Sequence, residues 1–257
     1  PETTDNEELY NLADKDIQNY LMDGAAGVVI SANTYFETFV HPLNKDYICY
    51  FENADIKPHG RFCLREPAFA IGAFDALEYV SGGQPLGSIG RDAETREFAQ
   101  AYGALPAKKF NLVPGITDPA VARFLQTPEG TYFYVVNLFH DDVTVHLDFS
   151  RNLPYLDLST EKKESGGTIV LKPFQLRSFL FPKEKVELKK LEFVSVGKET
   201  VPFYQKRIAA LKAAADMLEK GKVDVAGERK DIALVEKAFA ENRFAEMTRL
   251  AFCRRMN

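Results

Sequence analysis

The chain has 257 residues, of which 46% are hydrophobic and 27% charged, a composition typical of a globular protein with one large domain or several small ones. Its formal net charge of −5 argues against a broad nucleic-acid interface, which needs a dense basic surface, and against attraction to an anionic membrane. No apolar run is long enough to span a bilayer.

The chain begins PETTDNEELYNL, without an initiator Met or a signal peptide. We therefore expect it to start inside a longer protein or after a processing event. Its cysteines, Cys49, Cys63 and Cys253, have no short spacing, which excludes a zinc site built on paired cysteines. A Cys49–Cys63 disulfide and buried free thiols both remain open.

The first part of the chain alternates between strand-like and helix-like patterns. In order, the predicted elements are a buried strand (24–32), an aromatic loop (33–60), a helix (65–74), a second buried strand (75–83) and an amphipathic helix capped by Asp92 (92–105). Such alternation is typical of a parallel sheet covered by helices. A complete β/α barrel needs about 250 residues, so this segment can supply only the last part of one.

From residue 110 the pattern changes to a period of two. Strand-like runs separated by turn residues lie at 121–127, 131–139, 143–150, 167–182 and 186–196. Residues 132–150 form two apolar runs about the acidic link of His140, Asp141 and Asp142, which we interpret as a hairpin. Pro173 suggests an edge position or a bulge. Short antiparallel strands at roughly ten-residue spacing predict a β-sandwich.

After Gly197 the pattern is helical to the end of the chain. Pro202 fits the first turn of a helix that Gly221 closes, and two further helices follow at 228–242 and 243–256. Their predicted core stripe consists of Ile232, Val235, Phe239, Phe244, Met247 and Leu250.

The strand region resembles the accessory β-sandwich that follows the barrel of many glycoside hydrolases. In that module one strand ends in Val-Asn, a short Asp-Leu segment comes later, and a final strand carries a Leu-x-Pro-aromatic-x-Leu-Arg pattern. Here these features are Val136-Asn137, residues 157–160 (DLST) and residues 171–177 (LKPFQLR). Residues 96–110 resemble the last barrel helix of such enzymes, and residues 238–252 are similar to the helical ends of some bacterial members. The chain has no Trp, which departs from the aromatic sugar platforms common in this group.

The resemblance implies an α+β multidomain protein. Its parts would be the C-terminal end of a β/α (TIM-barrel-like) domain at 1–109, an antiparallel β-sandwich at 110–197 and a C-terminal helical segment at 198–257. A glycoside hydrolase acting on an oligo- or polysaccharide is the implied function, with the barrel segment lining the cleft and the sandwich as a structural brace. This chain alone would be inactive, and a second chain or a preceding N-terminal region would complete the barrel. By analogy, the protein would be secreted or periplasmic.

Two other functions stay open at this point. One is a non-catalytic module for carbohydrate binding or protein interaction, and the other is an α/β enzyme of another class with added β and α layers. Two buried parallel strands with covering helices have no place in a free-standing binding sandwich, which favours the enzyme fragment.

The candidate site residues follow from the barrel interpretation. Reactive residues of a barrel lie just after its strands, where Asn33, Tyr35 and Glu37 follow the first predicted strand and Gln84 the second. Glycoside hydrolysis uses two carboxyl groups, and we predict Glu37 as one of them. Asn33, Tyr35, Gln84 and His41, which lies in the aromatic loop, are the predicted substrate-binding residues. Each can equally be an ordinary loop residue, and the second carboxylate is not identified.

Other reactive motifs are not found in the sequence. The Gly-rich residues 81–92 match neither the dinucleotide-binding nor the P-loop pattern, and the histidines have no metal-binding spacing. No Gly-x-Ser-x-Gly nucleophile motif occurs. We therefore expect neither a metal nor a cofactor.

Overall fold

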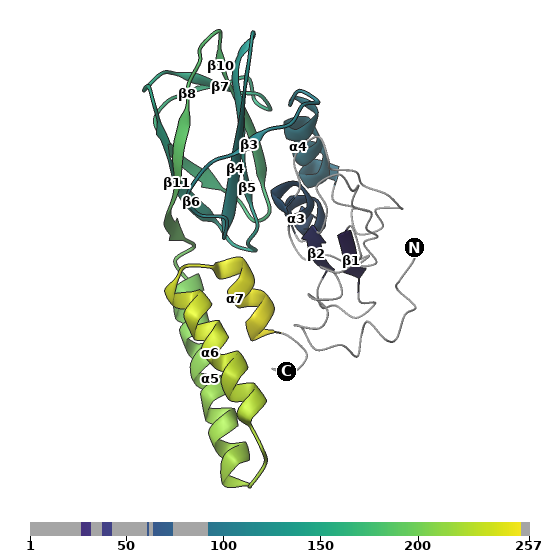
Figure 1. Cartoon of the computed structure of the whole chain (residues 1–257), viewed down its shortest axis with the longest axis vertical. Coiled ribbons are helices and arrows are strands. Elements are labelled where there is room, and N and C mark those ends of the chain that lie inside the picture. The colour runs from purple at the N-terminus through teal and green to yellow at the C-terminus, as the bar shows by residue number, and fades with distance from the viewer. Residues whose placement is uncertain (1–26, 32–37, 43–60, 62–63, 74–91, 253–257) are drawn as a thin grey trace.

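The structure is a computed structural model that describes residues 27–31, 38–42, 61, 64–73 and 92–252. Its described part combines antiparallel sheets with helices, which confirms the α+β class (Figure 1). No helix among these residues is long and apolar enough to cross a membrane.

Two antiparallel sheets form the centre of the described structure. The larger has six strands in the order β3 (Asn111–Leu112), β4 (Ala120–Thr127), β5 (Gly130–Asn137), β10 (Leu176–Pro182), β7 (Tyr155–Asp157) and β8 (Lys163–Glu164). The smaller has three strands in the order β11 (Leu188–Val196), β6 (Val143–Phe149) and β9 (Thr168–Leu171). The strand-like runs of the sequence all appear as strands, because their alternating apolar side chains find a buried face.

The two sheets share one apolar core. Val145 and Leu147 of β6 lie in the same buried cluster as Phe133 of β5 and Phe179 of β10. The rings of Phe133 and Phe179 stack with their centroids 4.7 Å apart. Burial of such aromatic and branched side chains stabilises each by about 1.5–3 kcal/mol relative to exposure. The facing sheets therefore hold each other together through their inner faces.

The segment 132–150 is not a hairpin, which corrects the sequence interpretation. β5 pairs with β4 and β10, whereas β6 pairs with β9 and β11. Residues 138–142 therefore cross from one sheet to the other. The run at 167–182 crosses in the same way, because its two halves are β9 and β10 in different sheets. Pro173 lies in that crossing and not at an edge or a bulge, so it removes no N–H from a strand ladder.

Helices cover the outer face of the six-stranded sheet. α3 (Arg65–Ala73) and α4 (Asp92–Gly103) lie beside it in Figure 1, close to the predicted helix bounds. Ala68 and Phe98 of these helices share a second buried cluster with Tyr134 and Leu176 of the sheet. β5 is thus buried on both faces, which explains why its sequence is nearly continuously apolar.

The start of the chain departs from the predicted parallel sheet. β1 (Gly27–Ser31) falls on the predicted strand, but it pairs antiparallel with β2 (Thr38–Pro42), inside the segment expected to be loop. The described residues of 24–106 contain no parallel strand pair. The second predicted strand, at 75–83, lies outside the described residues.

The tail is helical, as predicted. α5 (Thr200–Lys220) and α6 (Ala226–Ala240) form a long hairpin that extends away from the sheets, and α7 (Phe244–Ala251) lies at its near end (Figure 1). Phe244, Met247 and Leu250 of α7 are buried in the core that the two sheets share. Of the predicted core stripe, Phe239 alone is only partly buried.

Candidate functional site

Most of the predicted site residues lie outside the described part of the chain. Glu37, Asn33, Tyr35 and Gln84 lie outside the described residues. His41 lies in β2, where its backbone is opposite Val28 of β1. The predicted carboxylate and its sugar-binding neighbours therefore remain predictions from the sequence.

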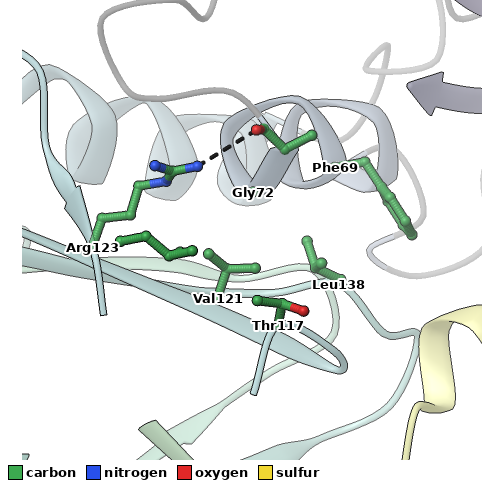
Figure 2. A pocket seen from close by; sticks show the side chains of 8 residues that line it. Phe69, Gly72, Thr117, Val121, Arg123 and Leu138 are labelled. Carbon is green, nitrogen blue, oxygen red and sulfur yellow. Dashed lines mark hydrogen bonds between the residues drawn. The ribbon is translucent and has the colours of Figure 1, made fainter. Parts of the chain in front are cut away.

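A groove of about 330 Å³ lies between α3 and the outer face of the six-stranded sheet. Figure 2 shows Phe69 and Gly72 of α3 on one side, with Val121, Arg123 and Leu138 on the other. Among the described lining residues Arg123 is the only charged side chain, and its Nη2 donates a long hydrogen bond of 3.5 Å to the Ala73 carbonyl. These residues include no carboxylate, so they do not supply the acid and base that hydrolysis of a glycoside needs. We interpret it as a packing gap between helix and sheet.

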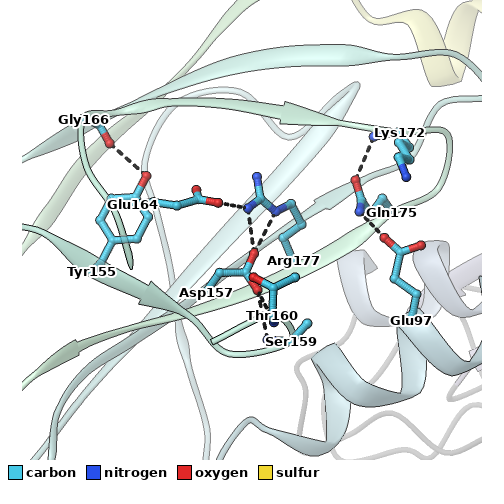
Figure 3. A network of polar contacts seen from close by, with 10 residues as sticks. All are labelled: Glu97, Tyr155, Asp157, Ser159, Thr160, Glu164, Gly166, Lys172, Gln175 and Arg177. Carbon is cyan, nitrogen blue, oxygen red and sulfur yellow. Dashed lines mark hydrogen bonds and ion pairs between the residues drawn. The ribbon is translucent and has the colours of Figure 1, made fainter. Parts of the chain in front are cut away.

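A buried ion pair connects strands β10 and β7 of the six-stranded sheet. Arg177 of β10 donates from Nη2 and Nε to Oδ2 of Asp157 at 2.6 and 3.2 Å (Figure 3). The other carboxylate oxygen of Asp157 accepts the backbone N–H groups of Ser159 and Thr160 at 2.9 and 3.0 Å. Arg177 also pairs with Glu164 of β8. All four lone-pair directions of the buried carboxylate are thus used for holding a turn against the sheet.

A second polar contact attaches α4 to the crossing between β9 and β10. Glu97 of α4 accepts a hydrogen bond from Gln175 (Figure 3). It also accepts one from Arg61 at 2.7 Å. Gln175 in turn accepts the backbone N–H of Lys172 at 2.9 Å. Arg61 donates also to the Pro173 carbonyl at 2.9 Å. The contact fixes the helix relative to the sheet, in addition to the apolar cluster beneath it.

Asn137 ties the two crossings between the sheets to each other. Its side-chain N–H₂ donates to the carbonyls of Asp141 and Lys172, both at 2.8 Å, and its Oδ1 accepts the Phe139 N–H at 2.8 Å. The side chain is fully buried. Sequence reasoning noted Val136-Asn137 only as a motif, although a polar residue that ends an apolar strand before a turn signals such a role.

Three titratable groups lie where the sheets meet the tail, of which Tyr204 is buried and Asp118 and His140 are half-buried. Burial raises the pKa of Asp118 to about 6 and lowers the pKa of His140 below its ordinary value. Burial also raises the pKa of Tyr204, whose hydroxyl is 2.6 Å from that of Thr248 and 3.5 Å from Nε2 of His140. Sequence reasoning missed Asp118, whose partners are more than a hundred residues away.

Among the described residues, no group of three or more His, Cys, Asp or Glu side chains could hold a metal ion. No protein-family model matches the chain, and no curated protein matches it either.

Proposed function

We propose that this chain is the C-terminal portion of a glycoside hydrolase that acts on an oligo- or polysaccharide. In this proposal the two facing sheets are the accessory β-sandwich and residues 24–106 belong to the end of a β/α barrel. The sandwich is a structural brace, and the segment around Glu37 lines the cleft as a source of one catalytic carboxyl group.

The observation that carries the proposal is the covered outer face of the six-stranded sheet. A sandwich that braces a catalytic domain has to pack one sheet face against the helices of that domain. α3 and α4 occupy this position, with Ala68 and Phe98 buried against the sheet and Glu97 bonded to Gln175. A free-standing binding module has no need of such helices.

The buried ion pair supports the resemblance on which the proposal rests. Asp157 belongs to the DLST segment and Arg177 to the LKPFQLR segment, both of which carry the likeness to the accessory sandwich. Their ion pair explains why an Asp and an Arg occupy these two positions, since removing either partner leaves the charge of the other buried. That role fits a brace and involves no chemistry on a substrate.

A carbohydrate-binding module is the alternative, and exposed aromatic rings are what it would need to stack on sugars. Among the residues of 64–73 and 92–252 whose side-chain exposure is described, the one exposed aromatic side chain is Phe203, which lies on α5 and not on a sheet. The six-stranded and the three-stranded sheet thus offer no aromatic platform among these residues. This observation favours the brace over the sugar-binding module.

The proposal includes a partner and a location. A second chain or a preceding N-terminal region completes the barrel and supplies the other carboxyl group, and the protein is secreted or periplasmic. β1 and β2 pair antiparallel and so are not adjacent strands of a parallel barrel. Among the described residues they form a two-stranded sheet, which is marginal without further strands, and in this proposal the parallel strands come from the second chain or the preceding region.

Two measurements separate the brace from the binding module. Co-sedimentation of the chain with insoluble cellulose, xylan and chitin should leave it in the supernatant, since the described side chains of the six-stranded and three-stranded sheets include no exposed aromatic ring. Its native mass beside its denatured mass should reveal a companion polypeptide. A monomer that binds one polysaccharide saturably would contradict the proposal and favour the module.

A further inference from the structure

The long helix α5 has a second apolar side in addition to the one that it buries. The buried side consists of Thr200, Tyr204, Ile208, Leu211 and Ala215. Phe203, Ala210 and Met217 follow one another at intervals of seven residues, so they lie almost in line on another side of the helix. Ala214 lies next to them, one turn from Ala210. These four residues, the α5 stripe, are all exposed, Phe203 to 52% and Met217 to 73%.

The hairpin of α5 and α6 has only a small core of its own. Figure 1 shows that the hairpin extends away from the sheets. Among the described residues, its outer part is held together by the buried cluster of Leu211, Ala215 and Ile232. Helices in proteins gain most of their stability from packing an apolar side. A further apolar surface against the α5 stripe would therefore stabilise a part of the molecule that extends beyond the sheets.

The α5 stripe is complementary to itself when two copies run antiparallel. Phe203 lies seven residues before Ala210 and Met217 seven residues after it. In an antiparallel pair that crosses at Ala210, Phe203 of each copy therefore packs on Met217 of the other. Beyond these contacts the exposed Glu199 of one copy reaches the exposed Lys220 of the other, because both lie about three turns from Ala210. A two-fold axis produces each of these contacts twice.

We propose that the α5 stripe is the interface of a homodimer, in which two copies of the chain pack their α5 helices antiparallel about a two-fold axis at Ala210. The occupant is a second copy and not an unrelated protein, since the order of apolar and charged residues is symmetric about Ala210. The inference does not depend on the proposed function, because it concerns only the tail.

The middle of the α5 stripe suits close packing of two helices. Ala210 and Ala214 have small side chains, which let helix axes approach to about 8 Å. The nearest basic residues, Lys206 and Arg207, come opposite alanines of the other copy, so no like charges face each other there. Helices about 30 Å long that pack along their length bury on the order of 1,000 Å² in total, near the lower limit of specific interfaces. We therefore expect a dissociation constant in the micromolar range.

The first measurement is sedimentation velocity of the whole chain from about 1 to about 200 µM, a range that includes such dissociation constants. Ala210→Glu places two carboxylates together on the axis, and Glu is a good helix former at an exposed position. Ala209→Glu is the matched control, because Ala209 is also exposed but is turned about 100° around the helix from Ala210. Circular dichroism checks that both variants are folded.

The second measurement tests the register and introduces no charge. Under mild oxidation Ala210→Cys should form a disulfide across the two-fold axis, where the two copies of this position face each other. Ala209→Cys is the control, since its side chains point away from the contact. The unmodified chain measures the background from Cys49, Cys63 and Cys253.

We expect the mass of the unmodified chain to rise with concentration from 28.9 kDa to twice that value. Ala210→Glu should weaken association roughly a hundredfold, because like charges meet in a contact that excludes water. Ala209→Glu should change association less than about threefold, as is usual for a surface substitution. Of the two cysteine variants, only Ala210→Cys should cross-link above the background.

A chain that stays monomeric at every concentration would overturn the proposal. A dimer that both glutamate variants weaken alike, or that neither weakens, would overturn the α5 stripe as its interface. If Ala210→Glu does not fold, cross-linking of Ala210→Cys, the milder change, decides the matter. A companion polypeptide appears as a second denatured mass, so failure of the dimer and failure of the proposed function are distinguishable.

Discussion

Arg177 and Asp157 form a buried ion pair that joins β10 to β7, with Nη2 of the arginine 2.6 Å from Oδ2 of the aspartate. The Asp157 side chain is only 3% exposed and that of Arg177 19%. The Arg177 guanidinium also lies 4.8 Å from the centroid of the Phe179 ring. A charge in this position is tolerated only because its partner is present.

Removing the arginine should therefore cost more than the loss of one contact. Arg177→Met leaves the Asp157 carboxylate buried with its backbone donors alone, and we expect the free energy of unfolding to fall by about 3 kcal/mol. Urea denaturation measures it. Lys212→Met breaks an exposed pair with Glu236 and should cost less than about 1 kcal/mol. Equal losses of unfolding free energy in the two variants would show that the buried pair contributes no more to stability than the exposed one.

The stability of the protein should depend on the hydrogen-bond donors of Asn137 and not only on the size of its side chain. Asn137→Asp keeps the shape but turns two donated bonds, to the carbonyls of Asp141 and Lys172, into contacts between acceptors. We expect a loss of roughly 3 kcal/mol or more in the free energy of unfolding, since buried acceptors are left unpaired. Asn152→Asp, at an exposed position, is the control and should be nearly neutral. An Asn137→Asp variant as stable as the unmodified chain would show that the two donated hydrogen bonds of Asn137 do not hold the crossings together.

His140 should make the protein less stable in acid. Burial is the main cause of its lowered pKa in the folded state, so the unfolded chain binds the proton more readily. Its contribution is fully present above about 6.5, the ordinary value, and is lost as the pH falls through the lower folded value. The difference in unfolding free energy between the unmodified chain and His140→Gln should therefore shrink from pH 7.5 to pH 5. A difference that grows toward acid would contradict the assignment.

Much of the fold could be predicted from local patterns. The period-two runs gave the strands at 121–127 and 143–150, and the helices at 65–74 and 92–105 followed from their apolar faces and first-turn residues. These signals are local, since side-chain period and caps depend only on neighbours in the chain.

The pairing of strands could not be predicted in the same way. Residues 132–150 have the pattern of a hairpin, yet Asn137 bonds to Lys172 and the chain crosses between sheets. The deciding contact comes from 35 residues away. The strand β2 could not be predicted within the aromatic loop either, because its sequence TFVHP contains a Pro and shows no clear alternation.

The candidate site was the least predictable part. The prediction of Glu37 rests on its place after a predicted strand, whereas its neighbours in space depend on long-range contacts that sequence patterns do not give. Asp118 illustrates the same limit, because its hydrogen-bond partners, the backbone N–H groups of Ala245 and Glu246, lie more than a hundred residues away in the chain.

Hydrolysis is the most direct test of the proposed function. The chain, together with the polypeptide that the proposal requires to complete a barrel, would be assayed for sugar release from a panel of aryl glycosides and polysaccharides. We predict that one class of substrate is cleaved, that Glu37→Gln reduces the rate at least a thousandfold by removing one of two catalytic carboxyl groups, and that Glu52→Gln in the same segment has little effect. Cleavage at an unchanged rate by Glu37→Gln would contradict the role of Glu37, and a complete assembly that cleaves none of the substrates would contradict the account as a whole.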